Sequence, residues 1–442
     1  MIEYRDLRIA ILGAGSVGAQ VARLLLENRQ ELSDRVGAGL ELVGIAVRDL
    51  DAPRSADIPR ELLTTDARSL ILGADIVIEL MGGLEPAREY LALALNSGAD
   101  VITANKALLA THGPELFEIA EQVGAQLYYE AAVGGAIPII RPLRDSLAGD
   151  RVKRILGIVN GTTNYILDRM DAEGDSLEEA LAEATRLGYA EADPTADIGG
   201  YDAAHKAAIL ASLAFHTTVP LDAVHREGIE HVTHAQVEGA KAAGYVVKLL
   251  AVCERLTDPE TGVEGVAARV HPALIPVTHP LGAVHGVNNA VYVEAEAAGP
   301  LMFYGAGAGG VQTASAVLGD LVSAARRHVI GGPGITEPTQ SEVPVLPITS
   351  VVTRYQITLQ VSDRPGVLAT IAALFSEHGV SVEAVQQSVP QLPTEQGESA
   401  ATATLVIGTH RATEAALAST VAALEASDVV AEVTSVLRVE GL

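Results

Sequence analysis

A glycine-rich turn near the N-terminus places the strongest constraint on the fold of this 442-residue chain. The apolar run Leu7–Leu12 leads directly into the sequence GAGSVG, and a helical pattern of apolar residues follows. Strand, glycine turn and helix in this order are typical of a dinucleotide site, where phosphates lie at the helix N-terminus. The sequence therefore predicts a Rossmann-type dinucleotide-binding domain, with a plain strand–helix turn of another α/β protein as the alternative. The cofactor contacts predicted from the turn are Gly13, Gly15, Ser16, Val17 and Gly18.

The end of the next predicted strand, Glu41–Val47, bears on the choice of cofactor. A site that prefers NAD usually carries an acid there, facing the ribose 2′-hydroxyl. Here Arg48 comes first and Asp49 follows. A guanidinium at this point would pair with a 2′-phosphate, which favours NADP, while the neighbouring Asp49 leaves NAD open. The alternative is that Arg48 is only a cation of the loop.

Strands and helices continue to alternate through Asp75–Leu80, 86–97 and Asp100–Thr103. We expect this first domain to cover residues 1–138. Lys106 follows the last of these strands, at the sheet edge where open α/β sheets bind ligands. The pattern therefore predicts Lys106 in the ligand site, the alternative being a solvated surface lysine.

The loop after the predicted strand Ala125–Glu130 is rich in glycine and reads AAVGGAIP. Such a loop, led by one carboxylate, can direct several carbonyl oxygens at one point. Oxygen ligands suit a hard cation such as Na⁺. A flexible crossover between domains is an equally good interpretation of these residues.

From Val152 onward, helices are followed by runs of strands, which predicts an α+β substrate-binding and dimerisation domain over 139–328. Within it, an acidic loop beginning at Glu191 leads into a helix that carries Asp202 and Lys206 four residues apart. This spacing puts both side chains on one helix face. Their neighbours are small or apolar, so the helix is expected to be buried, where an ammonium is costly unless paired. A catalytic pair and a structural ion pair both fit these residues.

A second glycine run, GAGAGG, precedes a helix predicted over 311–326. No βαβ unit follows it, so we expect the helix to return to the nucleotide domain, with the glycine loop near the nicotinamide. Residues 329–352 are rich in proline and glycine and predict a linker. Residues 353–442 follow a β-α-β-β-α-β order, which predicts a ferredoxin-like regulatory domain, or one that serves dimerisation only.

Composition excludes several classes of function. The chain carries 56 acids against 30 bases, for a net charge of −26, which argues against nucleic acid or an anionic membrane as a partner. A single cysteine, Cys253, excludes an internal disulfide and a cysteine zinc cluster. Without a signal peptide or a long apolar run, the chain is expected to be cytoplasmic.

Taken together, the motifs resemble homoserine dehydrogenase over nearly the whole chain. The resemblance rests on GAGSVG, TANKALL, EAAVGGAIPI, NGTTNYIL, the stretch EADPTADIGGYDAAHKAAIL, and GAGAGG before TASAVLGDL. The tail, with SDRPGVLA, resembles an ACT domain, a module that senses small amino acids. No aspartate kinase portion precedes the nucleotide domain, so the monofunctional form is the one resembled.

The resemblance implies NAD(P)-dependent interconversion of L-homoserine and L-aspartate 4-semialdehyde, in threonine and methionine biosynthesis. The ACT resemblance implies feedback regulation by an amino acid, with threonine as the candidate. Separately, we expect a homodimer or homotetramer, with a dimer built across the sheet of the middle domain as one arrangement. Lys206 would donate and accept the proton at the substrate oxygen, Asp202 would hold the substrate, and Lys106 would lie between cofactor and substrate. The remaining roles implied are the substrate amine at Glu191, a cofactor contact at Gly309, and a Na⁺ site at Glu130, Val133, Gly135 and Ile137, mostly through backbone carbonyls.

Two other functions compete with this interpretation. One is a different ACT-linked dehydrogenase acting on a 2-hydroxy acid, but the arginine and histidine set it needs is not found on the nucleotide domain. The other is an amino-acid sensor that binds a nucleotide without catalysis. The intact set of Glu191, Asp202 and Lys206 argues against such a sensor.

Overall fold

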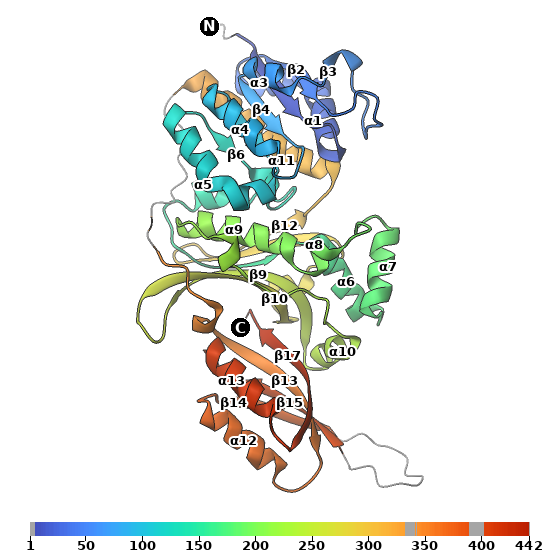
Figure 1. Ribbon diagram of the computed structural model, residues 1–442, viewed down its shortest axis with the longest axis vertical. Coiled ribbons are helices and arrows are strands. Elements are labelled where there is room, and N and C mark those ends of the chain that lie inside the picture. The colour runs from blue at the N-terminus through green and yellow to red at the C-terminus, as the bar shows by residue number, and fades with distance from the viewer. Residues whose placement is uncertain (1–4, 332–340, 342, 389–401, 442) are drawn as a thin grey trace.

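The structure is a computed structural model that describes residues 5–331, 341, 343–388 and 402–441. It has three tiers along its long axis (Figure 1). The nucleotide-binding domain forms one end, a broad sheet covered by helices forms the middle, and the C-terminal domain forms the other end. The predicted fold class, an α/β domain followed by an α+β domain and a ferredoxin-like domain, is confirmed.

The first domain is a parallel sheet in the strand order β3-β2-β1-β4-β5-β6. This is the doubly wound order of dinucleotide-binding folds, and it confirms the Rossmann-type prediction. The strands are β1 (Leu7–Leu12), β2 (Leu40–Ala46), β3 (Leu63–Thr64), β4 (Ile76–Glu79), β5 (Asp100–Thr103) and β6 (Leu127–Tyr128). The helices are α1 (Ser16–Glu27), α2 (Arg29–Val36), α3 (Ala67–Leu72), α4 (Ala87–Asn96) and α5 (Lys106–Val123).

Helix α11 (Gly310–Ile330) lies on this first domain although it follows the middle domain in the chain. Its apolar face, including Ala314, Val317 and Leu321, shares one buried cluster with α1 and β1. The contact holds the helix on the nucleotide domain because apolar surface of both the helix and the domain is removed from water. The predicted return of the helix is confirmed, and the helix is longer than the predicted range 311–326.

The middle domain is a mainly antiparallel sheet, in which only the short β8 among the described strands of this domain pairs in parallel, and helices that include α9 lie across it (Figure 1). Strand β12 was not predicted. Its last residues, Gly305 and Ala306, belong to the second glycine run, which hides the end of the strand. The strands are β7 (Val152–Ile158), β8 (His225–Arg226), β9 (Tyr245–Thr257), β10 (Glu264–Pro276), β11 (Asn288–Ala295) and β12 (Gly299–Ala306). The helices are α6 (Gly161–Ala172), α7 (Leu177–Arg186), α8 (Thr195–Ile198), α9 (Tyr201–Phe215) and α10 (His234–Ala242).

The C-terminal domain has the predicted β-α-β-β-α-β order, with strands arranged as β17-β13-β15-β14. Its last long strand, β17, also pairs in parallel with β10 at two residues, so one sheet continues from the middle domain into this domain. The sequence did not indicate this junction. The elements are β13 (Val352–Ser362), α12 (Val367–Glu377), β14 (Val382–Ser388), β15 (Thr402–Thr409), β16 (Ala412–Thr413), α13 (Glu414–Glu425) and β17 (Val430–Val439).

Ionic contacts cross the same junction. Glu440, which follows β17 and is buried, accepts a hydrogen bond of 2.8 Å from the buried guanidinium of Arg269 on β10. It also pairs with Arg154 of β7. Part of the predicted linker 329–352 lies outside the described residues. Of the rest, Ile330 belongs to α11, and Val345 bridges to Val266 at the start of β10.

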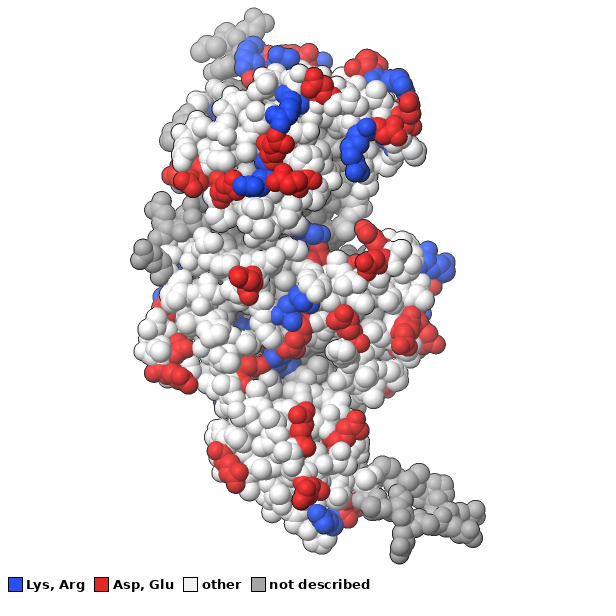
Figure 2. All heavy atoms as spheres, viewed as in Figure 1, with Lys and Arg blue, Asp and Glu red and all other residues white. Residues whose placement is uncertain are grey.

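Helices long and apolar enough to cross a membrane are absent from the described part of the chain. On the face shown in Figure 2, lysine and arginine side chains are scattered among acidic ones and do not gather into a basic patch. The same view shows the molecule hollowed between its first and middle tiers.

Candidate active site

Asp202 is the centre of a buried ionic cluster between the first and middle domains. It lies in the first turn of α9, whose preceding residue Gly200 has a φ of 76°, a conformation that glycine adopts without strain. A carboxylate in the first turn is favoured by the helix dipole. Its side chain is 7% exposed. The small and apolar residues that follow Asp202 bury α9 against the sheet, as the sequence predicted.

Lys206 lies one turn further along α9. Its Nζ donates hydrogen bonds of 2.7 Å to Oδ2 of Asp202 and 2.6 Å to the carbonyl of Val159. Burial holds the pKa of Lys206 below its usual range, and Lys106 also lowers it, while Asp202 raises it. An amine whose pKa lies closer to neutrality is better matched to moving a proton at physiological pH.

Lys106 reaches the same carboxylate from the other domain. It begins α5, directly after the helix cap Asn105, whose side chain accepts from the backbone N–H of Leu108. Its Nζ pairs with Oδ1 of Asp202, and its side chain is 42% exposed. Burial works to raise the pKa of Asp202, but the ammonium groups of Lys206 and Lys106 hold that pKa far below its usual range. The structure therefore brings the predicted residues Lys106, Asp202 and Lys206 together.

Asn160 is a member of the cluster that the sequence analysis did not select. It caps α6 through Oδ1, which accepts from the backbone N–H of Thr163. Its Nδ2 donates to Asp202 at 3.0 Å and to Asp197 at 2.7 Å. Burial raises the pKa of Asp197, and the charge of Asp202 adds to this effect. The motif NGTTN signals a turn and a helix cap, but nothing in it shows that the amide also faces two carboxylates.

Glu191 is not brought into this cluster. It lies exposed in the loop between α7 and α8. No hydrogen bond or ion pair within the described part of the chain joins it to Asp202, Lys206 or Lys106. Its predicted role at the substrate amine therefore stays a prediction.

The predicted glycine turn has the geometry that close approach of a pyrophosphate requires. Gly13 has a φ of 99°, and a Cβ at this position would lie 2.8 Å from the carbonyl oxygen of Leu80. A Cβ on Gly18 would collide with the carbonyl of Gly13, whereas the space beside Gly15 is open. Helix α1 begins at Ser16 without a side-chain cap, so its first N–H groups are available to an anion.

The second glycine loop lies against the first. A Cβ on Gly310 would come within 2.7 Å of the carbonyl oxygen of Ser16. Gly309, which precedes α11, has a φ of 124°, a conformation that side chains rarely tolerate. This contact agrees with the expectation that the second loop lies beside the dinucleotide site.

Arg48 follows β2 at the carboxyl edge of the parallel sheet and is exposed. None of the ion pairs among the described residues engages it. The guanidinium is thus at the predicted edge and is available to a ligand, as NADP selection would require.

The loop after Glu130 limits how a cation could be held. Both carboxylate oxygens of Glu130 accept hydrogen bonds, from the backbone N–H groups of Ile139, Ile140 and Arg141 and from the Arg141 side chain. The carboxylate is therefore committed to the protein. The described residues contain no group of three His, Cys, Asp or Glu side chains suited to a metal. A cation would have to be bound by backbone carbonyls, as the resemblance implied.

Val133 and Ile137 of the same loop are buried, and Gly135 has a φ of 60°. A Cβ on Gly135 would meet the carbonyl oxygens of Ala306 and Gly307, so the loop is packed closely against the second glycine run. The loop is thus an ordered contact between β12 and the nucleotide domain and not a flexible crossover.

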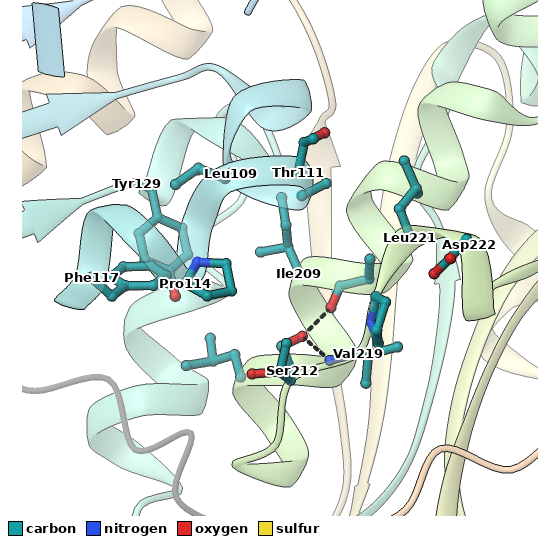
Figure 3. Close-up of a pocket in the computed structure, with 15 residues that line it drawn as sticks. Leu109, Thr111, Pro114, Phe117, Tyr129, Ile209, Ser212, Val219, Leu221 and Asp222 are labelled. Carbon is teal, nitrogen blue, oxygen red and sulfur yellow. Dashed lines mark hydrogen bonds between the residues drawn. The ribbon is translucent and has the colours of Figure 1, made fainter. Parts of the chain in front are cut away.

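A separate cavity of about 510 Å³ lies further along the same two helices, α5 and α9 (Figure 3). Phe117 and Pro114 of α5 face Ile209 and Ser212 of α9 across it. The Ser212 hydroxyl is occupied, since it donates to the Ala208 carbonyl and accepts from the backbone N–H of Val219. The lining is mostly apolar and lacks the charged cluster, so the chemistry belongs to the Lys106–Asp202–Lys206 end of the helix pair.

Comparison with known proteins agrees with this geometry. Family models described as "Homoserine dehydrogenase, NAD binding domain", "Homoserine dehydrogenase" and "ACT domain" match residues 13–130, 138–322 and 355–427. A homoserine dehydrogenase of Mycobacterium tuberculosis is 53% identical over 441 residues, which cover 99% of each chain. The chain belongs to the homoserine dehydrogenase family. A family member from Corynebacterium glutamicum is 52% identical over 98% of this chain and 95% of its own.

Solved structures of the family share the fold. The homoserine dehydrogenase of Thiobacillus denitrificans superposes with a TM-score of 0.89 at 37% identity, covering 99% of each chain. A hyperthermophilic archaeal homoserine dehydrogenase in complex with NADPH superposes with a TM-score of 0.60 at 28% identity, over 75% of this chain and 100% of its own.

Proposed function

We infer that the protein interconverts L-homoserine and L-aspartate 4-semialdehyde by hydride transfer with a nicotinamide dinucleotide, as an oxidoreductase of amino-acid biosynthesis. The observation that carries this inference is the Lys106–Asp202–Lys206 cluster, which joins the dinucleotide fold to the middle domain. Family membership at 53% identity over nearly the whole chain supports it. We further propose that the domain boundaries are those of the sequence analysis: 1–138, 139–328, 329–352 and 353–442.

In this mechanism Lys206 moves the proton at the substrate oxygen. When homoserine is oxidised, its hydroxyl loses a proton to the neutral amine while hydride leaves the same carbon. The bound nicotinamide supplies the hydride acceptor. Burial disfavours the charged ammonium of Lys206, which makes the amine a base at lower pH than a solvated lysine. In the reverse reaction the same ammonium donates the proton to the carbonyl oxygen.

Asp202 and Lys106 orient the reactants. Asp202 holds the Lys206 ammonium in place, and Asn160 in turn holds Asp202 by donating a hydrogen bond to it. The partly exposed Lys106 pairs with Oδ1 of Asp202, which suits a position between cofactor and substrate. Groups held in place in this way lower the entropic cost of reaching the transition state. We propose that Glu191, on the exposed loop before α8, binds the ammonium of homoserine.

For the cofactor, the glycine turn would hold the pyrophosphate and Arg48 would select the 2′-phosphate of NADP. The archaeal relative in complex with NADPH supports this preference. We also propose that Na⁺ binds at the loop of Glu130, Val133, Gly135 and Ile137 through backbone carbonyls. The close packing of this loop on β12 supports a role in ordering the two domains.

We propose that an amino acid, with threonine as the first candidate, regulates the enzyme at the C-terminal domain. The match of residues 355–427 to the ACT domain supports this role. A cavity of about 380 Å³ at the turn between β13 and α12, lined by residues that include Ser362, Asp363 and Arg364, would take it. We propose a homodimer or homotetramer in the cytoplasm as the working form.

The test is oxidation of NADPH by the purified full-length chain with L-aspartate 4-semialdehyde, followed at 340 nm. Turnover that depends on the semialdehyde supports the proposal. Binding of NADPH without turnover would instead support an amino-acid sensor without catalysis. Turnover with 2-oxo acids and none with the semialdehyde would support a different dehydrogenase.

A further inference from the structure

We propose that Arg226 and Glu227 are positioning residues that connect the C-terminal domain to Asp202, so that this domain sets the geometry of the catalytic cluster. The proposal deepens the proposed function and rests on it. It comes from a chain of contacts that runs from β17 through β8 to the first turn of α9. None of the residues between Arg438 and Tyr201 in this chain was selected by the sequence analysis.

The chain of contacts begins in the C-terminal domain. Arg438 of β17 is buried, and its guanidinium donates to the Glu414 carboxylate within its own domain. The same guanidinium reaches out of the domain and donates to Oε2 of Glu227 at 2.8 Å. Oε1 of Glu227 pairs with the imidazole of His225 at 2.7 Å. Burial works to raise the pKa of Glu227, but His225 and Arg438 hold it far below its usual range, so this carboxylate is charged.

The next step passes through the short strand β8, which Arg226 shares with His225. Both β8 and β17 pair with β10, so the same strand holds both of them. The backbone N–H of Glu227 donates to the carbonyl of Val270 on β10 at 2.7 Å. The connection consists of backbone hydrogen bonds to β10 and a partly buried ion pair. A shift of β17 should therefore displace β8 as well.

Arg226 joins β8 to the start of α9. Its guanidinium donates to the carbonyl of Gly199 and lies over the ring of Tyr201, 3.5 Å from the ring centroid. Tyr201 is the first residue of α9 and immediately precedes Asp202. The stem of Arg226 also limits Gly200, where an added Cβ would lie 3.4 Å from its Cγ. Arg226 therefore fixes the backbone on both sides of the turn that directs Asp202.

The backbone beside Arg226 strengthens the same attachment. Ile229 donates its N–H to the carbonyl of Ile198 at 2.7 Å, next to the start of the turn. A Cβ on Gly228 would collide with the same carbonyl and lie 2.7 Å from the Cα of Gly199. This close approach leaves the turn between α8 and α9 little freedom relative to β8. Asp197, which shares Asn160 with Asp202, lies in α8 on the other side of the turn.

The first experiment replaces Arg226 and measures the pH dependence of homoserine oxidation. Arg226→Gln removes the guanidinium from Gly199 and Tyr201 without touching Lys106, Asp202 or Lys206. We expect kcat to fall about tenfold, with KM for the nicotinamide cofactor within twofold of the native value. We also expect the alkaline plateau to begin at lower pH, because a displaced Asp202 supports the Lys206 ammonium less.

A matched control exists at the other end of the same helix. Arg255 lies over the ring of Phe215 at 5.2 Å and donates to the Phe215 carbonyl at 3.2 Å, so it caps the C-terminal end of α9. Arg255→Gln should leave the pH profile unchanged. Tyr201→Phe, which keeps the ring, should retain native kcat, and Tyr201→Leu should reproduce Arg226→Gln. Tyr201 is 45% exposed, so both variants are expected to fold.

The second experiment breaks the contact between Glu227 and Arg438 of the C-terminal domain. Glu227→Gln removes the charge that Arg438 meets, and inhibition of the full-length chain by L-threonine should weaken at least fivefold. A native pH profile in Arg226→Gln, or the same shift in Arg255→Gln, would overturn the positioning role. Native inhibition in Glu227→Gln would overturn the connection to the C-terminal domain. Failure of the native chain to turn over the semialdehyde would refute the proposed function itself and would be seen before any variant is made.

Discussion

Replacing Lys206 by methionine tests the catalytic assignment most directly. Methionine has nearly the length of the lysine stem, so the change removes the ammonium without opening a large void. The Val159 carbonyl loses its 2.6 Å donor, which costs about 1–3 kcal/mol. Asp202 keeps Lys106 and Asn160 as partners. Removal of a buried ammonium offsets part of the loss, so the free energy of unfolding should change by less than about 2 kcal/mol.

The effect on the reaction should be far larger. Loss of a general acid–base group reduces the rate by about 10²–10⁴-fold, which corresponds to about 3–5 kcal/mol of activation free energy. We expect kcat in the semialdehyde assay to fall within this range. The dissociation constant for NADPH, measured by its fluorescence, should stay within about threefold because Lys206 makes no contact with the glycine turn.

Lys248→Met is the matched control for this variant. Lys248 is also buried, donates to Asn164 and to the Val284 carbonyl, and has its pKa lowered to about 8 by burial. It therefore shares the burial and hydrogen bonding of Lys206 but lies outside the cluster. Its kcat should stay within about threefold of the native value. Equal losses of kcat in the two variants, or a kcat within fivefold of native for Lys206→Met, would refute the assignment.

Three further predictions concern the cofactor, the cluster and stability. Arg48→Ala should raise the dissociation constant of NADPH about tenfold or more and leave that of NADH unchanged in titrations; equal effects on both would contradict the 2′-phosphate role. Asp202→Asn removes the charge that raises the Lys206 pKa, so the pH limb for homoserine oxidation should move to lower pH, and an unmoved limb would exclude Lys206 as the titrating base. Burial raises the pKa of Asp320 to about 7. The protonated side chain therefore stabilises the folded state below about pH 4, the unfolded pKa. This stabilisation is lost as the pH rises toward 7, by up to about 1.4 kcal/mol for each pH unit. Asp320→Asn should flatten this slope in denaturant unfolding, and an unchanged slope would exclude Asp320 as its source.

The fold could be predicted from the sequence where local chemistry decides it. Neighbouring residues determine the glycine turn after β1 and the alternation of strands and helices. They also determine the order of elements in the C-terminal domain. Asp202 and Lys206 could also be paired, because their spacing on a helix puts them on one face.

The contacts that the sequence could not show join distant segments of the chain. Lys106 meets Asp202 only because α5 and α9 come together across two domains. Asn160 caps α6 locally, but its contact with Asp202 exists only because the fold brings the start of α6 to the start of α9. Glu130 was expected at a cation site, and nothing local shows that its carboxylate is taken up by the backbone of residues 139–141.

The sheet shared by β10 and β17 means that the C-terminal domain cannot be cut away cleanly. Removing it would leave Arg269, 1% exposed, with Glu254 but without Glu440, and would uncover hydrogen-bonding groups of β10 at Ala273 and Leu274. A truncated chain should therefore lose solubility as well as regulation.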